Sequence, residues 1–94
     1  VAQLTRCLAM DLAEDNIRVN AVCPGSIRTR ATDRHIASLG LDPDEAYTEF
    51  GKDSLMKRMG RPDEIAAGVL FLASDDASFM TGAHIVIDGG ATID

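Results

Sequence analysis

Apolar residues recur every three or four positions at the start of the chain, at Val1, Leu4, Leu8 and Leu12. That spacing puts them on one face of a helix, which we expect over residues 1–14. Asn16 tolerates the left-handed conformation that commonly ends helices, so the helix should stop just before it. The first element is therefore an amphipathic helix with one buried face.

A different pattern follows over residues 17–23, where Val, Ala and Cys occur with little strict alternation. Such a run is typical of a strand that is covered on both faces. The run stops abruptly at Pro24-Gly25 and opens into polar residues. Because ligands in an open α/β sheet sit outside the carboxyl ends of the strands, residues 24–29 are the first place to expect function.

Residues 30–59 are polar and less regular, with short helices expected at 32–39 and 43–50. This segment carries too many apolar residues for a solvated linker. We interpret it as a lid-like segment that folds over something, with its methionines used in packing. The apolar residues are Ile36, Leu39, Leu41, Tyr47, Phe50, Leu55, Met56 and Met59.

The last third of the chain predicts a second strong helix over 62–73, which opens with Pro62 and two acidic residues. A strand is expected at 84–88, closed by Gly89-Gly90. The order is helix, strand, excursion, helix, strand. Two strands joined by a long crossover that contains a helix should be parallel, so we predict an α/β fold with one structural unit spanning residues 1–94.

Composition narrows the possible partners. The chain has 94 residues and a formal net charge of −6, so a nucleic-acid backbone would be repelled. No apolar run approaches the roughly 20 residues of a membrane-spanning helix. The two cysteines, Cys7 and Cys23, are expected to be buried small hydrophobes in a reducing, cytoplasmic setting. His35 and His84 have no partners at ligand spacing, so no metal site is expected.

Four stretches in order carry a resemblance to the short-chain dehydrogenase/reductase family, specifically to its C-terminal portion. The resemblance implies the last part of a Rossmann-like, doubly wound parallel sheet. It also implies that the chain begins inside the helix of the catalytic Tyr-x-x-x-Lys, just beyond the Lys. The stretches are Leu4–Ala13 leading into Asn16–Asn20, Pro24–Thr29, Arg61–Ile65 with Leu70–Asp75, and Thr81-Gly82 followed by Ile87–Gly90.

The resemblance further implies an NAD(P)-dependent oxidoreductase that interconverts an alcohol and a carbonyl of a small-molecule substrate. On these residues it implies the nicotinamide end of the site: a turn at Pro24 and Gly25, backbone hydrogen bonds from Ile27 and a hydroxyl contact from Thr29. It implies no catalytic residue in this chain, since Tyr47 is followed at the fourth position by Gly51. The isolated chain should be inactive, and the full-length protein a homo-oligomer.

Several of these residues also have a purely structural interpretation. By spacing alone Thr29 is a helix-capping or turn hydroxyl, and Asn20 is expected to bond neighbouring backbone. Asp88-Gly89-Gly90 is interpreted as a turn with no helix after it, rather than a phosphate loop. Arg58 and Arg61 are expected to pair with the acids at the start of helix 62–73 rather than clamp an acidic substrate.

A competing hypothesis comes from a different class of protein. The chain would then be a small α/β interaction module that pairs with another subunit through an exposed sheet edge and its helix faces. An open reading frame upstream of Val1 that continues into Tyr-x-x-x-Lys would support the enzyme. A start codon at that position would support the module.

Overall fold

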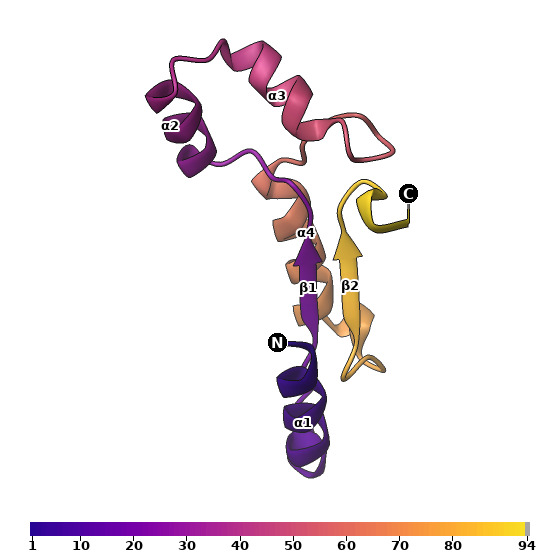
Figure 1. Cartoon of the computed structure of the whole chain (residues 1–94). Helices are drawn as coiled ribbons and strands as arrows, with labels where there is room; N and C mark the ends of the chain where they lie inside the picture. Colours follow the sequence, from indigo (N-terminus) through magenta and orange to yellow (C-terminus); the bar gives the residue numbers. More distant parts are fainter. Residues whose placement is uncertain (94) are drawn as a thin grey trace.

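The computed structural model describes residues 1–93 and contains the two parallel strands and the helices that the pattern predicts (Figure 1). Three single turns of 3-10 helix complete it, at Ala13–Asp15, Asp75–Ala77 and Ala91–Ile93. The main elements are α1 (Ala2–Leu12), β1 (Ala21–Pro24), α2 (Arg30–Ser38), α3 (Pro43–Gly51), α4 (Pro62–Ala73) and β2 (His84–Ile87).

The two strands form a parallel sheet in which Ala21 lies opposite His84 and Pro24 lies opposite Ile87. Helix α4 packs against one face of this sheet. A Cβ added to Gly68 of α4 would come within 2.3 Å of the Ile87 Cδ1 atom, so the missing side chain lets the helix approach β2 closely. The α/β fold and the parallel pairing are therefore as expected.

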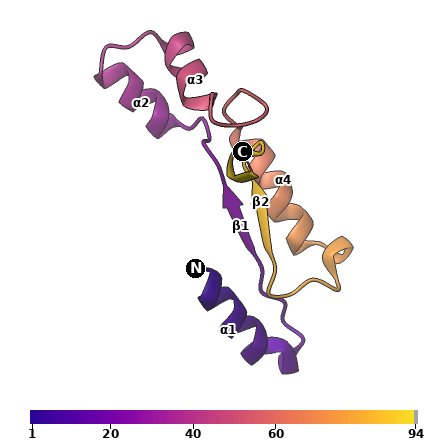
Figure 2. The ribbon, with the colours of Figure 1, turned by 45° about the vertical axis from the view of Figure 1, so that its right-hand side comes forward.

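The molecule is extended along the strand direction. Its radius of gyration is 16.3 Å and its extents are 52 × 26 × 23 Å, whereas a compact domain of this length has a radius of gyration of about 12 Å. Helix α1 lies toward the amino ends of the strands, and α2 and α3 lie beyond their carboxyl ends in both views (Figures 1 and 2). Among residues 1–93 the buried hydrophobic side chains are Ala9, Ile36, Ala46 and Ala77.

The predicted strand at 17–23 is wrong at its start, because β1 begins only at Ala21. Before that point the two segments are joined by side-chain hydrogen bonds and by a backbone hydrogen bond from the Gly82 amide to the Val19 carbonyl at 2.7 Å. The Asn20 side chain accepts a hydrogen bond from the Ala83 amide at 3.0 Å. The Val19 amide donates to the Thr81 hydroxyl at 3.2 Å. Asn20 therefore has the structural role expected of it.

The helix boundaries agree more closely. Helix α4 covers 62–73 as predicted, and α1 ends two residues before the expected 14 in a 3-10 turn that Asn16 closes with φ of 59°. Helix α2 begins at residue 30 rather than 32, because Thr29 caps it. Helix α3 extends one residue past the expected 43–50.

Asp88 ends β2 one residue earlier than predicted, because its carboxylate caps a turn. It accepts hydrogen bonds from the Gly90 amide at 2.9 Å and the Thr92 amide at 3.0 Å. The same contacts start the 3-10 turn Ala91–Ile93, so the expectation that no helical turn follows was wrong. The interpretation of Asp88–Gly90 as a turn is confirmed.

Residues 30–59 form a pair of helices that pack on each other around Ile36 and Ala46, both buried. The end of this segment is tied to the end of β2, because the Met56 amide donates to the Gly89 carbonyl at 3.2 Å. Leu39 and Met56 remain 56% and 61% exposed. Leu39 and Met56 therefore bury less surface than the pattern predicts, while Tyr47, Phe50 and Met59 are half-buried.

Candidate functional site

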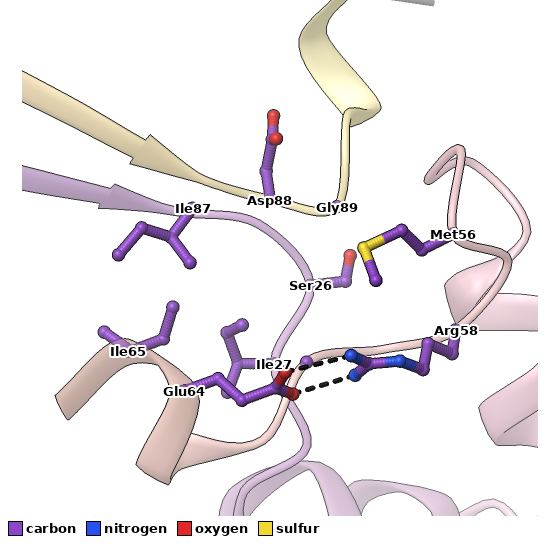
Figure 3. A pocket seen from close by; sticks show the side chains of 10 residues that line it. Ser26, Ile27, Met56, Arg58, Glu64, Ile65, Ile87, Asp88 and Gly89 are labelled. Atoms are coloured by element: carbon purple, nitrogen blue, oxygen red, sulfur yellow. Dashed lines mark hydrogen bonds and ion pairs between the residues drawn. The ribbon is translucent and has the colours of Figure 1, made fainter. Parts of the chain in front are cut away.

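The carboxyl ends of β1 and β2 open onto a cavity of about 90 Å³, which also borders the first turn of α4. Figure 3 shows side chains from both strand ends, α4 and the loop before it arranged around this space. Its walls are mainly apolar. They include Ser26 and Ile27 after β1, Ile87 and Asp88 at the end of β2, and Glu64 and Ile65 of α4.

Gly25 links the segment after β1 to the end of β2. Its amide donates to the Ile87 carbonyl at 3.0 Å. A Cβ at this position would lie 2.7 Å from the Asp88 Cβ and 2.8 Å from the Asp88 Cα. Pro24, which has no N–H to donate, occupies the last position of β1. The Pro-Gly pair therefore ends the strand and lets the following residues pass close to Asp88.

Ile27 is aligned by a single parallel bridge to Gly60. The Gly60 amide donates to the Ser26 carbonyl at 2.9 Å, and the Arg28 amide donates to the Gly60 carbonyl at 2.8 Å. In a trans peptide the C=O and N–H groups point in opposite directions. The N–H and C=O of Ile27 itself therefore both point away from Gly60, toward the same side.

Those two groups of Ile27 differ in what they contact. The Ile27 carbonyl accepts a hydrogen bond from the Thr32 hydroxyl at 3.2 Å. The Ile27 N–H has no acceptor within hydrogen-bond distance among residues 1–93. A carbonyl oxygen carries two lone pairs, so one of them stays available beside the unpaired N–H. Ile27 thus presents an adjacent donor and acceptor.

Thr29 is the N-cap of α2, which confirms its structural interpretation. Its hydroxyl accepts from the Thr32 amide at 3.3 Å and lies 3.1 Å from the Thr32 hydroxyl. The Thr32 hydroxyl also accepts from the Thr29 amide at 3.4 Å. Thr32 was missed as a candidate from the sequence. Its signal was its place three residues after the N-cap, where a side chain can return to the cap backbone.

Ion pairs form at the start of α4, beside the cavity. Arg58 binds both carboxylate oxygens of Glu64, at 2.8 and 2.9 Å, and Arg61 pairs with Asp63 at 3.1 Å. The hydrogen bonds from Arg58, followed by the Arg61 amide, lower the pKa of Glu64 to about 2. Both arginines therefore have acidic partners within the chain, as expected.

Tyr47 on α3 faces Arg28 and Asp33 rather than the cavity. Its hydroxyl donates to the Asp33 carboxylate, and the Arg28 guanidinium lies 3.8 Å from the centre of its ring. The hydrogen bond to Asp33 raises the pKa of Tyr47. A tyrosine that works as an acid/base catalyst near neutral pH needs the opposite shift. Tyr47 therefore links the loop after β1 to α2 and α3.

The last candidates from the sequence are the two cysteines, a metal site and a membrane-spanning helix. Cys7 and Cys23 are free but half-buried, so the expectation of full burial was wrong. Within the described range 1–93, no three His, Cys, Asp or Glu side chains gather in a way that could hold a metal ion. No helix in that range is long and apolar enough to span a bilayer.

A parallel sheet covered by α4, with a cavity at the carboxyl ends of its strands, defines part of a Rossmann-like α/β protein. Residues 1–92 match a family model described as enoyl-(acyl carrier protein) reductase. The chain is also 42% identical over 92 residues to meso-2,3-butanediol dehydrogenase of Serratia marcescens, a match covering 98% of this chain and 34% of that protein. The chain belongs to the short-chain dehydrogenase/reductase family.

Solved structures agree with this assignment. A short chain dehydrogenase family protein from Francisella tularensis has a TM-score of 0.87 and 43% identity, covering 99% of this chain and 40% of that one. A 4-hydroxyisoleucine dehydrogenase complexed with NADH has a TM-score of 0.83 and 33% identity, covering 99% of this chain and 36% of that one. The chain spans about a third of the length of the curated relatives it matches.

Proposed function

We propose that this chain is the C-terminal part of an NAD(P)-dependent oxidoreductase that interconverts an alcohol and a carbonyl. Residues 1–94 form the last part of a single Rossmann-like domain, with 30–59 as its substrate loop. The observation that carries the proposal is at the carboxyl end of β1, where the Ile27 N–H has no acceptor among residues 1–93 and the Ile27 carbonyl beside it keeps one lone pair available.

The nicotinamide carboxamide fits these groups. It is a planar amide with two N–H donors and one acceptor oxygen. Its oxygen can accept from the Ile27 N–H, and one of its N–H groups can donate to the second lone pair of the Ile27 carbonyl. Thr29 has one lone pair left after accepting from the Thr32 amide, so it can receive the other N–H. Pro24 and Gly25 form the turn that brings Ile27 and Thr29 there.

The helices α2 and α3 support the role of 30–59 as a substrate loop. They extend past the carboxyl ends of both strands (Figure 2). The Thr32 hydroxyl of α2 bonds the Ile27 carbonyl after β1, and the Met56 amide after α3 bonds the Gly89 carbonyl after β2. A segment in this position can cover a small-molecule substrate and exclude water. Loss of water strengthens the electrostatic interactions around the reacting groups.

The bound dinucleotide supplies the hydride chemistry, and this chain supplies orientation. We propose no catalytic residue among these 94, because the one tyrosine, Tyr47, is engaged by Asp33 and Arg28. We therefore expect the chain alone to show no turnover of NADH or NADPH with a carbonyl substrate. Turnover by the purified 94-residue chain would contradict this expectation.

The test of the nicotinamide site uses the complete gene product with Thr29→Val, and Thr29→Ser as the matched control. Removing one neutral hydrogen bond should weaken NADH or NADPH binding about 2- to 10-fold. The corresponding ADP-ribose, which lacks the nicotinamide, should bind both variants as it binds the wild type. Equal weakening of both ligands would mean that Thr29 only caps α2.

We also propose a homo-oligomer for the full-length protein. Helix α4 and strand β2 carry side chains that are more than half exposed, Val69, Leu70 and Val86 among them. Exposed apolar side chains on these two elements support burial against further protein surface, and a second subunit is the surface that we propose. Size-exclusion chromatography with light scattering on the complete gene product tests this. A monomer would contradict it.

A further inference from the structure

Thr32 lies at the point where the two groups proposed to hold the nicotinamide meet. Its hydroxyl donates to the Ile27 carbonyl at 3.2 Å and accepts from the Thr29 amide at 3.4 Å. It also lies 3.1 Å from the Thr29 hydroxyl. One side-chain oxygen therefore contacts both residues of the proposed site.

The proton assignments at Thr32 follow from the available donors. A threonine hydroxyl has one hydrogen and two lone pairs. The Ile27 carbonyl has no hydrogen of its own, so the Thr32 hydrogen goes there. The contact between the two hydroxyls then uses the hydrogen of Thr29. This leaves the Thr29 hydroxyl as an acceptor toward any ligand. Thr32 therefore decides that the Thr29 hydroxyl accepts from a ligand and does not donate to it.

Thr32 also completes the alignment of Ile27. The Gly60 bridge fixes the peptide groups on both sides of Ile27 from one direction. The Thr32 hydroxyl donates to the Ile27 carbonyl from a different direction. Without it, the Ile27 carbonyl would lose its one donor among residues 1–93 and would no longer have a fixed direction.

We propose that Thr32 is a positioning residue for the nicotinamide carboxamide, acting through Ile27 and Thr29 rather than by contact with the cofactor. This inference rests on the proposed function. Thr32→Val separates the two roles of the residue. The variant removes the hydroxyl but keeps the backbone N–H of residue 32, so the cap from Thr29 to α2 remains.

The experiment measures affinities of the complete gene product for two ligands. The first ligand is NADH or NADPH, whichever binds the wild type more tightly. The second is the same nucleotide without the nicotinamide, which is ADP-ribose for NADH and 2′-phospho-ADP-ribose for NADPH. We expect Thr32→Val to weaken the dinucleotide about 2- to 10-fold with ADP-ribose unchanged. Thr32→Ser, which keeps the hydroxyl, should bind both ligands as the wild type does.

A spectroscopic readout is independent of the ligand. With a ¹³C label at the Ile27 carbonyl, its amide I band should move to higher frequency in Thr32→Val, since the carbonyl loses a hydrogen bond. The band should stay in place in Thr32→Ser. An unmoved band in Thr32→Val would overturn the proposed contact.

The remaining outcomes separate this inference from the proposed function. If Thr32→Val weakens both ligands equally, or neither, while Thr29→Val weakens only the dinucleotide, Thr32 is not a positioning residue and the nicotinamide site stands. If neither variant discriminates between the two ligands, the nicotinamide site itself is overturned. A dinucleotide loss in Thr32→Ser equal to that in Thr32→Val would also overturn the role of the hydroxyl.

Discussion

The isolated 94-residue chain should not exist as a folded monomer, because it exposes too much surface. Its accessible area is 6704 Å². A globular protein of 10.0 kDa exposes about 5,200 Å², so the chain carries about 1,500 Å² more than a compact monomer would. That excess is close to the total area buried in a standard protein interface, about 1,600 Å².

Much of the exposed area is apolar. Val1 is 95% exposed, Leu70 is 71% exposed and Phe79 is fully exposed. Hydrophobic burial is the main favourable term in folding, and the buried hydrophobic side chains among residues 1–93 include three alanines and one isoleucine. The stabilisation from such a core is small against the conformational entropy of ordering the chain. The structure therefore needs further protein surface against which to pack.

Light scattering after size exclusion, combined with thermal unfolding, tests this reasoning. The purified chain should have a mass above 10.0 kDa or should lack a cooperative transition. It should also bind a dye that reports exposed apolar surface. A monomer of 10.0 kDa with a sharp, cooperative transition would refute the reasoning.

Two further predictions concern the complete gene product. Gly25→Ala forces a methyl group to within 2.7 Å of Asp88 and should lower the free energy of unfolding by about 1–3 kcal/mol. The control Ser26→Ala, at the next position, should leave the free energy of unfolding nearly unchanged. Equal stability of the two variants in denaturant unfolding would contradict this. Glu64 has a pKa of about 2 in the folded state against 4.5 when unperturbed, so its stabilising pair with Arg58 is complete above pH 4.5 and is lost as the pH falls toward 2. Urea midpoints should fall less over that range in Glu64→Gln than in the wild type, and identical pH dependence in the two would count against the pair.

Local signals were sufficient for most of the elements. Pro62 and the acids after it specify the start of α4 without help from the rest of the chain, and the helix covers the predicted residues. Asp42 and Pro43 do the same for α3. The start of β1 was missed because strand ladders depend on a partner. The Asn20 side chain, not its backbone, makes the contact with Ala83.

The position of the candidate site could also be read from the sequence, since Pro24-Gly25 marks the carboxyl end of a strand. The contacts within the site could not be predicted from the sequence. Ile27 and Gly60 lie 33 residues apart, and their bridge exists only once 30–59 has folded back. Spacing favoured a capping role for Thr29 and the resemblance implied a cofactor contact, and the cap on α2 is the role that its contacts confirm.

The sequence by itself determined the type and order of the helices and strands, the family, and the turn at which a ligand site should lie. Capping, turn and periodicity signals act over a few residues, so they can be identified in the sequence without knowledge of the fold. Tertiary structure alone decided which way the N–H and C=O of Ile27 point, because their direction depends on the bridge to Gly60. That bridge joins two segments that lie far apart in the sequence, so it forms only when the chain has closed on itself.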